Sequence, residues 1–202
     1  MRQIVIYIIV FLLSTLKINA KNMADMFLTM PDTLMPYIEK EQRVDLINMK
    51  NIVPSTSAKL STIFKNDIEI NTLSDSRIEI TVGKLHYDIV RLSSKETDSL
   101  YCMLCTVHTP LQQTTCTVYD KEWKLLYQLD FEKEIKSALN KNENDICLFE
   151  KMELPIIKAK LNDDNISLDI EIKDGLPLKD NDKNEAVLQR KLKWNKESFK
   201  EY

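Results

Sequence analysis

The chain has 202 residues, with 28 Lys and Arg against 31 Asp and Glu, and a formal net charge of −3. This mild acidity offers no positive field for nucleic acid phosphates, so it excludes a nucleic acid partner. The sequence contains two glycines, Gly83 and Gly175, whereas phosphate-binding loops, dinucleotide fingerprints and nucleophile elbows need several glycines close together. The composition therefore predicts no nucleotide cofactor. The sequence contains no tight cluster of Cys and His residues, so we expect no metal site.

Residues 1–20 predict a signal peptide. An apolar run over residues 4–16 follows a positive start, Lys17 ends the run, and Ala20 is a small residue that suits a signal peptidase. The run is shorter than the roughly 20 apolar residues of a membrane-spanning helix. We therefore expect an exported protein, periplasmic or in the cell envelope. After removal of the signal, residues 21–202 should form a single α+β domain with no transmembrane span.

Two prolines, Pro31 and Pro36, divide the segment after the signal, because proline is tolerated mainly in the first turn of a helix. We predict a short helix before Pro31 and a second helix over residues 40–50. In the second helix, the apolar pattern predicts two inward side chains and three in water: Val44 and Ile47 inward, and Glu41, Arg43 and Lys50 in water.

From residue 58 onward the apolar residues recur with a period of two, which is typical of half-buried antiparallel strands. The predicted strands cover residues 67–73, 76–82, 85–92, 99–107, 114–120, 123–129, 155–161 and 165–172, with a last strand near 188–194. Residues 99–107 are apolar without alternation, which predicts a central strand that is covered on both faces. The expected fold is α+β, a mostly antiparallel meander of about eight to ten strands with short N-terminal helices.

One amphipathic helix is predicted over residues 131–139. Asp130 can cap its first turn through a side-chain oxygen, and Glu132 and Glu134 place negative charge where the helix dipole favours it. The apolar stripe of this helix consists of Phe131, Ile135, Ala138 and Leu139.

The chain has four cysteines, which would lie in an oxidising compartment if the protein is exported. A hairpin centred between Pro110 and Leu111 would place Cys105 directly opposite Cys116, which is compatible with a disulfide. The alternative is that these two residues are small buried hydrophobic side chains. Cys102 and Cys105 have the CxxC spacing, but on a strand they point to opposite faces, which disfavours a shared metal or a redox pair.

No catalytic residue can be assigned from the sequence, and each candidate has a simpler alternative. The acidic pairs Asp163 with Asp164, and Asp32 with Glu39, could perform acid–base chemistry or could be solvated carboxylates. His108 could activate Cys105 or Cys116 as a nucleophile, although no orienting third group or oxyanion hole is evident.

Three aromatic residues could line a ligand groove or fill the core: Tyr119, Trp123 and Tyr127. Residues 180–184 begin like a calcium loop but depart from its pattern afterwards, which favours a solvated loop.

Two stretches, residues 26–49 and 106–126, contain a Met-Pro-Asp opening, an Arg-x-Asp-Leu helix and a Tyr-Asp-x-x-Trp hairpin. With these motifs the chain resembles a family of exported proteins from Bacteroides-type bacteria that is classed as a domain of unknown function. The resemblance implies a cell-envelope or periplasmic location and implies no activity or functional residue. It also implies possible O-glycosylation of Thr33 and Ser99, because each stands in a tripeptide that resembles the acceptor sequence of such bacteria: Asp-Thr-Leu and Asp-Ser-Leu.

The function we expect from these observations is that of a non-catalytic binding or interaction module in the envelope, with another envelope protein or a small ligand as its partner. The alternative is a hydrolase whose carboxylate or Cys-His site is assembled only in the fold. A concave pocket with two carboxylates about 5–9 Å apart, or a thiol within reach of His86 or His108, would favour the hydrolase. A third candidate function is binding through a sheet edge, to which a strand of a partner protein is added.

Overall fold

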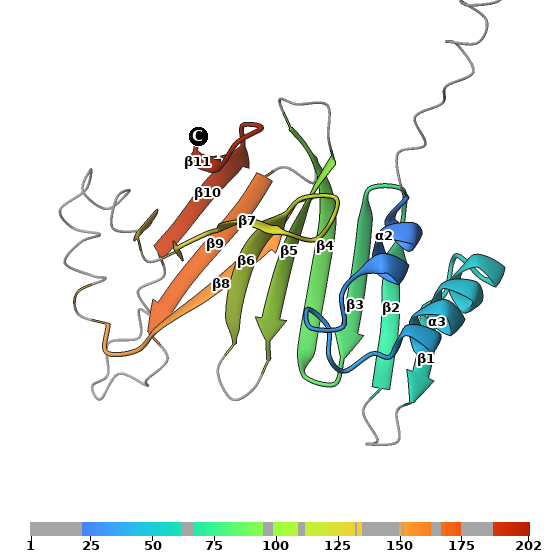
Figure 1. The fold of residues 1–202 in the computed structure, drawn as a ribbon. Helices are drawn as coiled ribbons and strands as arrows, with labels where there is room; N and C mark the ends of the chain where they lie inside the picture. Colours follow the sequence, from blue (N-terminus) through green and yellow to red (C-terminus); the bar gives the residue numbers. More distant parts are fainter. Residues whose placement is uncertain are drawn as a thin grey trace, which may run out of the picture.

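The structure is a computed structural model that describes residues 22–61, 67–94, 99–108, 112–131, 133–134, 150, 152–162, 167–174 and 188–202. In this part of the chain, helices α2 (Met23–Thr29) and α3 (Lys40–Ile52) precede eleven strands in two antiparallel sheets (Figure 1). The predicted fold class, α+β with a mostly antiparallel meander, is confirmed. The strand count exceeds the expected range by one. No helix of the described residues is long and apolar enough to cross a membrane.

The larger sheet is a seven-stranded meander in which every strand pairs with its neighbours in the sequence. Its strands are β1 (Ala58–Ser61), β2 (Asp67–Leu73), β3 (Arg77–Val82), β4 (Leu85–Ser93), β5 (Ser99–Val107), β6 (Gln113–Tyr119) and β7 (Leu125–Gln128). The smaller sheet has the order β11-β10-β9-β8 and is a meander as well. Its strands are β8 (Pro155–Leu161), β9 (Ser167–Asp174), β10 (Leu188–Trp194) and β11 (Phe199–Glu201).

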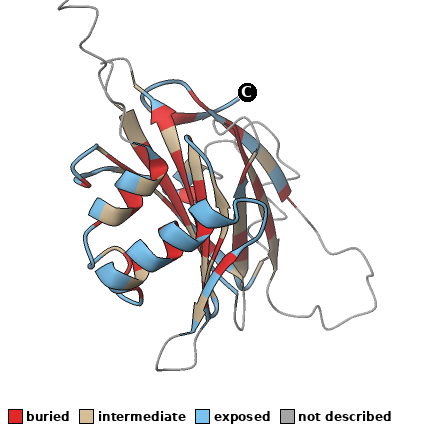
Figure 2. Ribbon diagram, turned by 90° about the vertical axis from the view of Figure 1, so that its right-hand side faces the viewer, coloured by how far each residue is buried: buried red, intermediate tan, exposed pale blue. Residues whose placement is uncertain are grey.

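The two helices cover one face of the seven-stranded sheet and the four-stranded sheet packs on the other face, so the protein has three layers (Figure 2). Two hydrophobic cores result, and β5 contributes to both because its side chains alternate. Tyr101 and Met103 pack in the core beneath the helices, whereas Cys102 and Leu104 pack in the core between the sheets. All four are buried, which confirms the prediction that this strand is central and covered on both faces.

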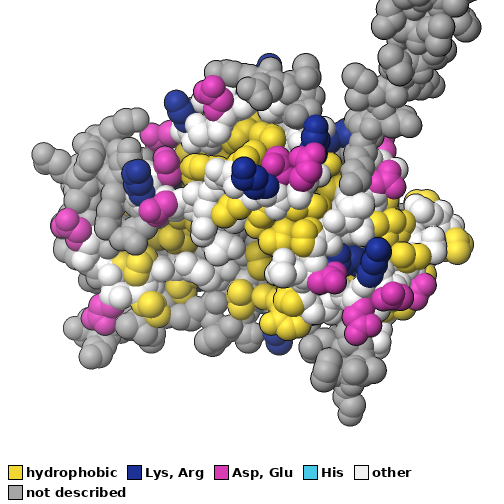
Figure 3. Space-filling model, viewed as in Figure 1, with side chains coloured by type: hydrophobic (Ala, Val, Ile, Leu, Met, Phe, Trp, Pro, Cys, Tyr) yellow, Lys and Arg dark blue, Asp and Glu magenta, His cyan; other side chains and the backbone are white. Residues whose placement is uncertain are grey.

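Figure 3 shows the helix-covered face in the orientation of Figure 1, with apolar side chains gathered in its middle among scattered charges. The exposed large apolar side chains of the chain include Val44, Met49 and Ile52 on α3 and Leu125 and Leu126 on β7. None of the described side chains visible in this view is a histidine.

The two N-terminal helices form where they were predicted, but the orientation predicted for α3 is wrong in part. Val44 is 41% exposed, whereas Arg43 is fully buried and Lys50 is 5% exposed. The stripe that faces the sheet is Arg43, Leu46, Ile47 and Lys50, at helical spacing. Two cations can lie on this stripe because backbone carbonyl oxygens accept their hydrogen bonds, which removes most of the cost of burying them.

Arg43 stabilises the irregular segment between α2 and α3. Its guanidinium donates to the carbonyl oxygens of Met30, Met35 and Ile38 and to Oδ1 of Asp32. The prolines of this segment prevent a regular helix, so its carbonyl groups need partners from elsewhere. Lys50 acts similarly at the other end of α3, where Nζ donates to the carbonyl oxygens of Thr56 and Asn71 at 2.6 and 3.0 Å.

The register of the β5–β6 hairpin differs by one residue from the prediction. Cys105 pairs with Thr115, and Cys116 pairs with Leu104. Cys105 therefore packs toward the helices and Cys116 toward the smaller sheet, so these two residues are not the facing pair that we predicted. The structure holds both as free thiols.

The helix predicted over residues 131–139 lies mostly outside the described residues. Its start is described: Oδ1 of Asp130 accepts a hydrogen bond from the backbone N–H of Lys133 at 3.0 Å, as expected of an N-cap. Phe131, Lys133 and Glu134 are helical. The pair Asp163 and Asp164 and the loop over residues 180–184 also lie outside the described residues.

We predict that Arg43→Met lowers the free energy of unfolding by about 2–4 kcal/mol, because buried carbonyl groups lose their hydrogen-bond donor. Urea unfolding followed by circular dichroism measures the change. Lys40→Met, at an exposed position of the same helix, serves as the control and should change stability by less than about 0.5 kcal/mol. Equal effects of the two substitutions would contradict the role given to Arg43.

Candidate functional site

A cavity of about 620 Å³ lies between the two sheets, and we call it the inter-sheet cavity. The larger sheet lines it with residues of β3, β4 and β5 and of the loop after β5, and the smaller sheet with residues of β8, β9 and β10. Most of the lining residues are polar or charged: Arg77, Glu79, His86, Asp88, Thr106, His108, Gln112, Lys158, Lys160, Asp169, Glu171, Gln189, Arg190 and Lys191.

The alternation of β3 places these polar side chains opposite the buried apolar ones. Ile78, Ile80 and Val82 pack beneath the helices, so Arg77, Glu79 and Thr81 point to the other face. The register then aligns polar residues across the strands, since Glu79 pairs with Asp88, Thr81 with His86, and His86 with Thr106. Polar rows therefore cross β3, β4 and β5 at the end of the sheet that lines the cavity.

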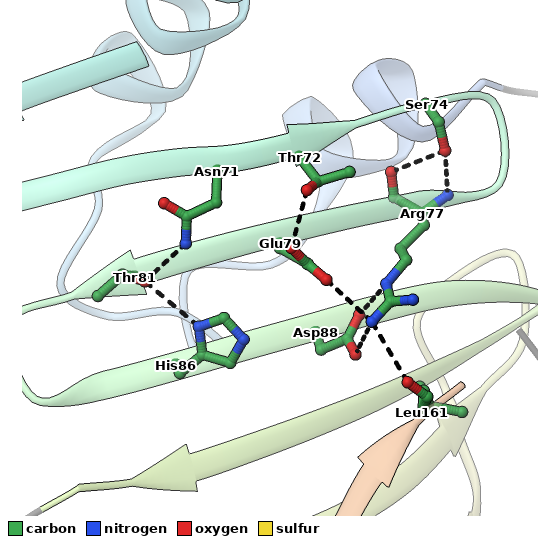
Figure 4. A network of polar contacts seen from close by, with 9 residues as sticks. All are labelled: Asn71, Thr72, Ser74, Arg77, Glu79, Thr81, His86, Asp88 and Leu161. Carbon is green, nitrogen blue, oxygen red and sulfur yellow. Dashed lines mark hydrogen bonds and ion pairs between the residues drawn. The ribbon is translucent and has the colours of Figure 1, made fainter. Parts of the chain in front are cut away.

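Arg77 is the centre of the polar network in Figure 4. Its Nε and Nη2 atoms donate to the two carboxylate oxygens of Asp88 at 2.9 and 2.8 Å. Nη2 also lies 2.9 Å from Oε1 of Glu79 and 3.5 Å from the carbonyl oxygen of Leu161 on β8. One guanidinium group thus holds two carboxylates of the larger sheet and contacts the backbone of the smaller sheet.

Asp88 lies in an environment that disfavours its charged form. Its side chain is 5% exposed, and burial raises its pKa to about 6 despite the opposing attraction of Arg77, with Glu79 adding to the rise. The charge of Lys160 also lowers the pKa, which places this β8 cation within electrostatic reach of Asp88. Asp88 therefore changes its charge at mildly acidic pH, whereas the bidentate geometry still favours the ion pair above that pH.

The two histidines of the chain lie together beside this network. The rings of His86 and His108 have centroids 6.2 Å apart in an edge-on arrangement. Nδ1 of His86 lies 3.3 Å from the hydroxyl oxygen of Thr81, which also accepts a hydrogen bond from Asn71 at 2.9 Å. Burial lowers the pKa of His86, so this ring is neutral at neutral pH.

The lining combines both signs of charge, and the described residues provide no cluster of three or more His, Cys, Asp or Glu side chains that could hold a metal ion. The cavity offers hydrogen-bond donors, acceptors and fixed charges to a molecule that enters it, together with the apolar side chains of Leu104, Ala159 and Ile170. Such groups recognise polar ligands and fix their orientation.

The cysteine–histidine arrangement considered from the sequence is not assembled. His108 lines the inter-sheet cavity, whereas Cys105 packs on the opposite face of β5, beneath the helices. Cys116 is fully buried in the core between the sheets beside Cys102, with the two sulfur atoms 3.6 Å apart. Cys102 and Cys105 point to opposite faces, as predicted from their spacing.

The aromatic residues that could have lined a groove belong to the cores. Trp123 is 8% exposed, and its ring centroid lies 5.3 Å from that of Tyr101 and 5.6 Å from that of Tyr119. Tyr127 packs at the margin of the core between the sheets. These residues fill space rather than form the cavity.

The remaining predicted site residues lie apart from the cavity. Asp32 pairs with Arg43 at 2.9 Å, and Glu39 caps α3, so they form no acid–base pair. Thr33 is exposed in the turn between the helices, and Ser99 begins β5, half-buried, with Ser93 as its strand partner. The sequence did not point to Arg77, Glu79 or Asp88. It named His86 and His108 only as possible partners of a catalytic thiol.

The fold and the cavity define an antiparallel α+β protein with a polar space between two sheets. The chain belongs to the family described as "Protein of unknown function (DUF3256)", whose family model matches residues 15–199. A solved structure from Porphyromonas gingivalis W83, a domain of an uncharacterized protein, is similar to it with a TM-score of 0.68. The two share 17% sequence identity over 91% of this chain and 98% of that chain, which shows a common fold. A search of curated proteins finds no match. The resemblance to a domain of unknown function is thereby confirmed.

We predict that the side-chain carboxyl carbon of Asp88 titrates in NMR spectra with a midpoint of about 6, against its ordinary value of 3.8. The folded state then holds this proton more tightly than the unfolded chain. The stability contributed by the proton is complete below pH 3.8 and is lost as the pH rises through about 6. Arg77→Met should move the midpoint further upward, because the cation that opposes the effect of burial is removed. A midpoint at or below 3.8 would show that the ion pair outweighs burial.

Proposed function

We propose that the protein is an exported binding module of the periplasm or cell envelope, without catalytic activity, and that its inter-sheet cavity takes a small zwitterionic ligand. The observation that carries the proposal is the cavity itself, about 620 Å³ in volume and lined by residues of both sheets. This volume lies within the range of roughly 300–1,000 Å³ that is usual for small-molecule sites.

The charge of the lining supports the zwitterionic chemistry of the ligand. Both sheets bring charges of both signs to the lining: Arg77, Glu79 and Asp88 from the larger sheet, and Lys158, Lys160, Asp169, Glu171, Arg190 and Lys191 from the smaller sheet. A lining with both signs is complementary to a molecule with both signs, such as a short peptide with free termini, and less so to an inorganic anion. Lys160 is suited to the carboxylate and Glu79 to the ammonium group of such a ligand.

The engagement of the carboxylates supports a non-catalytic role. Glu79 and Asp88 both contact Nη2 of Arg77, and Glu79 also accepts a hydrogen bond from Thr72 at 2.8 Å. A general acid or base must take up or release a proton during the reaction, whereas the contacts with Arg77 and Thr72 hold these carboxylates as hydrogen-bond acceptors.

A hydrolase remains the second candidate because one observation favours it. The cavity holds two carboxylates whose oxygens lie 2.9 and 2.8 Å from one nitrogen atom, and burial raises the pKa of one of them, Asp88, to about 6. Two neighbouring carboxyl groups in unequal environments are typical of acid–base pairs.

Export rests on the sequence of residues 1–20, with their apolar core and the small residue Ala20 at the end. O-glycosylation of Thr33 and Ser99 belongs to the same proposal, and the exposure of Thr33 supports access to its hydroxyl group. Ser99 is half-buried on β5, so Thr33 is the better acceptor of the two.

We predict that the protein isolated from the envelope fraction of its host begins near Lys21, because a signal peptidase has removed the residues before it. N-terminal sequencing and intact mass of that material measure the cleavage and any added glycan. Ala20→Arg, which places a large charged side chain at the cleavage position, should leave the signal attached. Cytoplasmic protein that retains Met1 would contradict export without touching the ligand proposal.

We predict that free dialanine raises the melting temperature of the purified protein at millimolar concentration, because ligand binding stabilises the folded state. N-acetyl-dialanine amide, which lacks both charges, is the matched ligand control and should have no effect. Calorimetric titration should show about tenfold weaker binding to Lys160→Ala and to Glu79→Gln. Lys200→Ala, at an exposed position away from the cavity, should bind like the unmodified protein.

The same titrations separate the two candidate functions. Equal binding of the charged and the blocked dipeptide, or none by either, would contradict a zwitterionic ligand. Turnover of a peptide or glycoside substrate that Glu79→Gln abolishes would instead establish the hydrolase.

A further inference from the structure

The core between the sheets contains a pair of cysteines that the proposed function does not use. Cys102 on β5 and Cys116 on β6 are both completely buried, and their sulfur atoms lie 3.6 Å apart. Cys102 pairs with Val118 and Cys116 with Leu104, so the two cysteines are diagonal neighbours on one face of adjacent antiparallel strands. Diagonal neighbours with short side chains are usually too far apart to touch, but here the two sulfur atoms are in contact.

We propose that Cys102 and Cys116 form a disulfide bond in the mature protein. The bond requires the sulfur atoms to approach from 3.6 Å to about 2.05 Å. Among the cysteines that the structure describes, the geometry singles out this pair, because Cys105 faces the helices on the other side of β5. Supply of the oxidant rests on the proposed export, since such bonds persist in oxidising compartments.

The chemistry balances with a protein or small-molecule disulfide as the oxidant. The thiolate of one cysteine attacks the oxidant and forms a mixed disulfide, and the second thiolate then displaces the carrier sulfur. The two cysteines lose two protons and two electrons in total, and the oxidant is reduced to a dithiol if it is a protein disulfide, or to two thiols if it is a small-molecule disulfide.

The burial of the pair determines when the bond can form. The contact with Cys116 and the loss of water raise the pKa of the Cys102 thiol well above its ordinary range, so little thiolate exists in the folded protein. Cys102 and Cys116 belong to the same buried core between the sheets as Val118 and Leu168. We therefore expect oxidation during folding, when the β5–β6 hairpin has formed and the smaller sheet has not yet packed on it.

The bond would stabilise the centre of the larger sheet. It closes a loop from Cys102 to Cys116, which restricts the unfolded chain more than the folded one. For a loop of about 15 residues in a chain of this size, loss of the bond should lower the melting temperature by roughly 5–10 °C.

The test is to refold the purified protein in a glutathione redox buffer and to map its disulfides. Because the buffer supplies the oxidant, the result does not depend on where the protein is located in the cell. Trypsin is unsuitable, because no Lys or Arg lies between Glu96 and Asp120 and all three described cysteines stay in one peptide. A protease that cleaves after Leu104 and Leu111 separates them. We expect a linked pair of peptides that contain Cys102 and Cys116, with Cys105 free for alkylation after denaturation.

Three variants make the result specific. The double variant Cys105→Ser/Cys147→Ser retains only the proposed pair and should lose about 2 Da in intact mass on oxidation. Cys102→Ser should lack the bond and melt roughly 5–10 °C lower than the oxidised protein, whereas Cys105→Ser should keep both the bond and the melting temperature. Free thiols at Cys102 and Cys116 after refolding, or a bond to Cys105 or Cys147 instead, would overturn the proposal. The export proposal is tested separately: an uncleaved N-terminus would contradict it and would leave the disulfide result unaffected.

Discussion

The guanidinium group of Arg77 is the interaction on which the polar half of this structure depends. It belongs to β3 of the larger sheet, binds Asp88 in bidentate fashion, forms an ion pair with Glu79 and contacts the carbonyl oxygen of Leu161 in the smaller sheet. Two carboxylates this close in a partly buried space repel each other unless a cation lies between them. Arg77 therefore permits the polar rows of β3 and β4 to be covered by a second sheet.

Two other polar contacts connect the sheets at different points. Nε1 of Trp194 donates to the carbonyl oxygen of Ser93 at 2.7 Å, and the backbone N–H of Ile157 donates to the side chain of Gln113 at 3.2 Å. Together with the Arg77 contact they fix the smaller sheet against β3, β4 and β6, while the apolar side chains between the sheets supply most of the burial. One part of the interface is thus a closed core, and the polar part remains open as the cavity.

The sequence determined much of the fold because most strands carry strong local signals. The period of two in Ile68 and Ile70, and again in Leu168, Ile170 and Ile172, predicted buried faces that the structure contains. The continuous apolar run of β5 predicted a strand covered on both faces. The register of the β5–β6 hairpin was missed by one residue, because hydrophobic pattern alone does not fix the length of a loop.

The errors at polar positions have a common physical cause. Arg43, Lys50, Arg77 and Asp88 were expected in water or left unassigned, since charged residues are seldom buried. Their burial depends on partners distant in the sequence: the carbonyl groups of an irregular segment for Arg43, and residues of neighbouring strands and of β8 for Arg77. Alternation identifies the face on which Arg77 and Glu79 lie, but it does not reveal that a second sheet covers this face. The candidate site therefore emerged from the packing of the sheets.

The central claim is that Arg77 joins the two sheets. The most direct test compares the amide hydrogen exchange of Arg77→Met with that of the unmodified protein. If Arg77 holds the smaller sheet on the larger one, amides of β8 and β9 should exchange at least about tenfold faster in the variant, because local opening becomes easier. Amides of α3 and β2, on the other side of the larger sheet, should keep their protection. Unchanged protection in β8 and β9, or a uniform loss across the whole chain, would contradict the claim that this guanidinium group joins the two sheets.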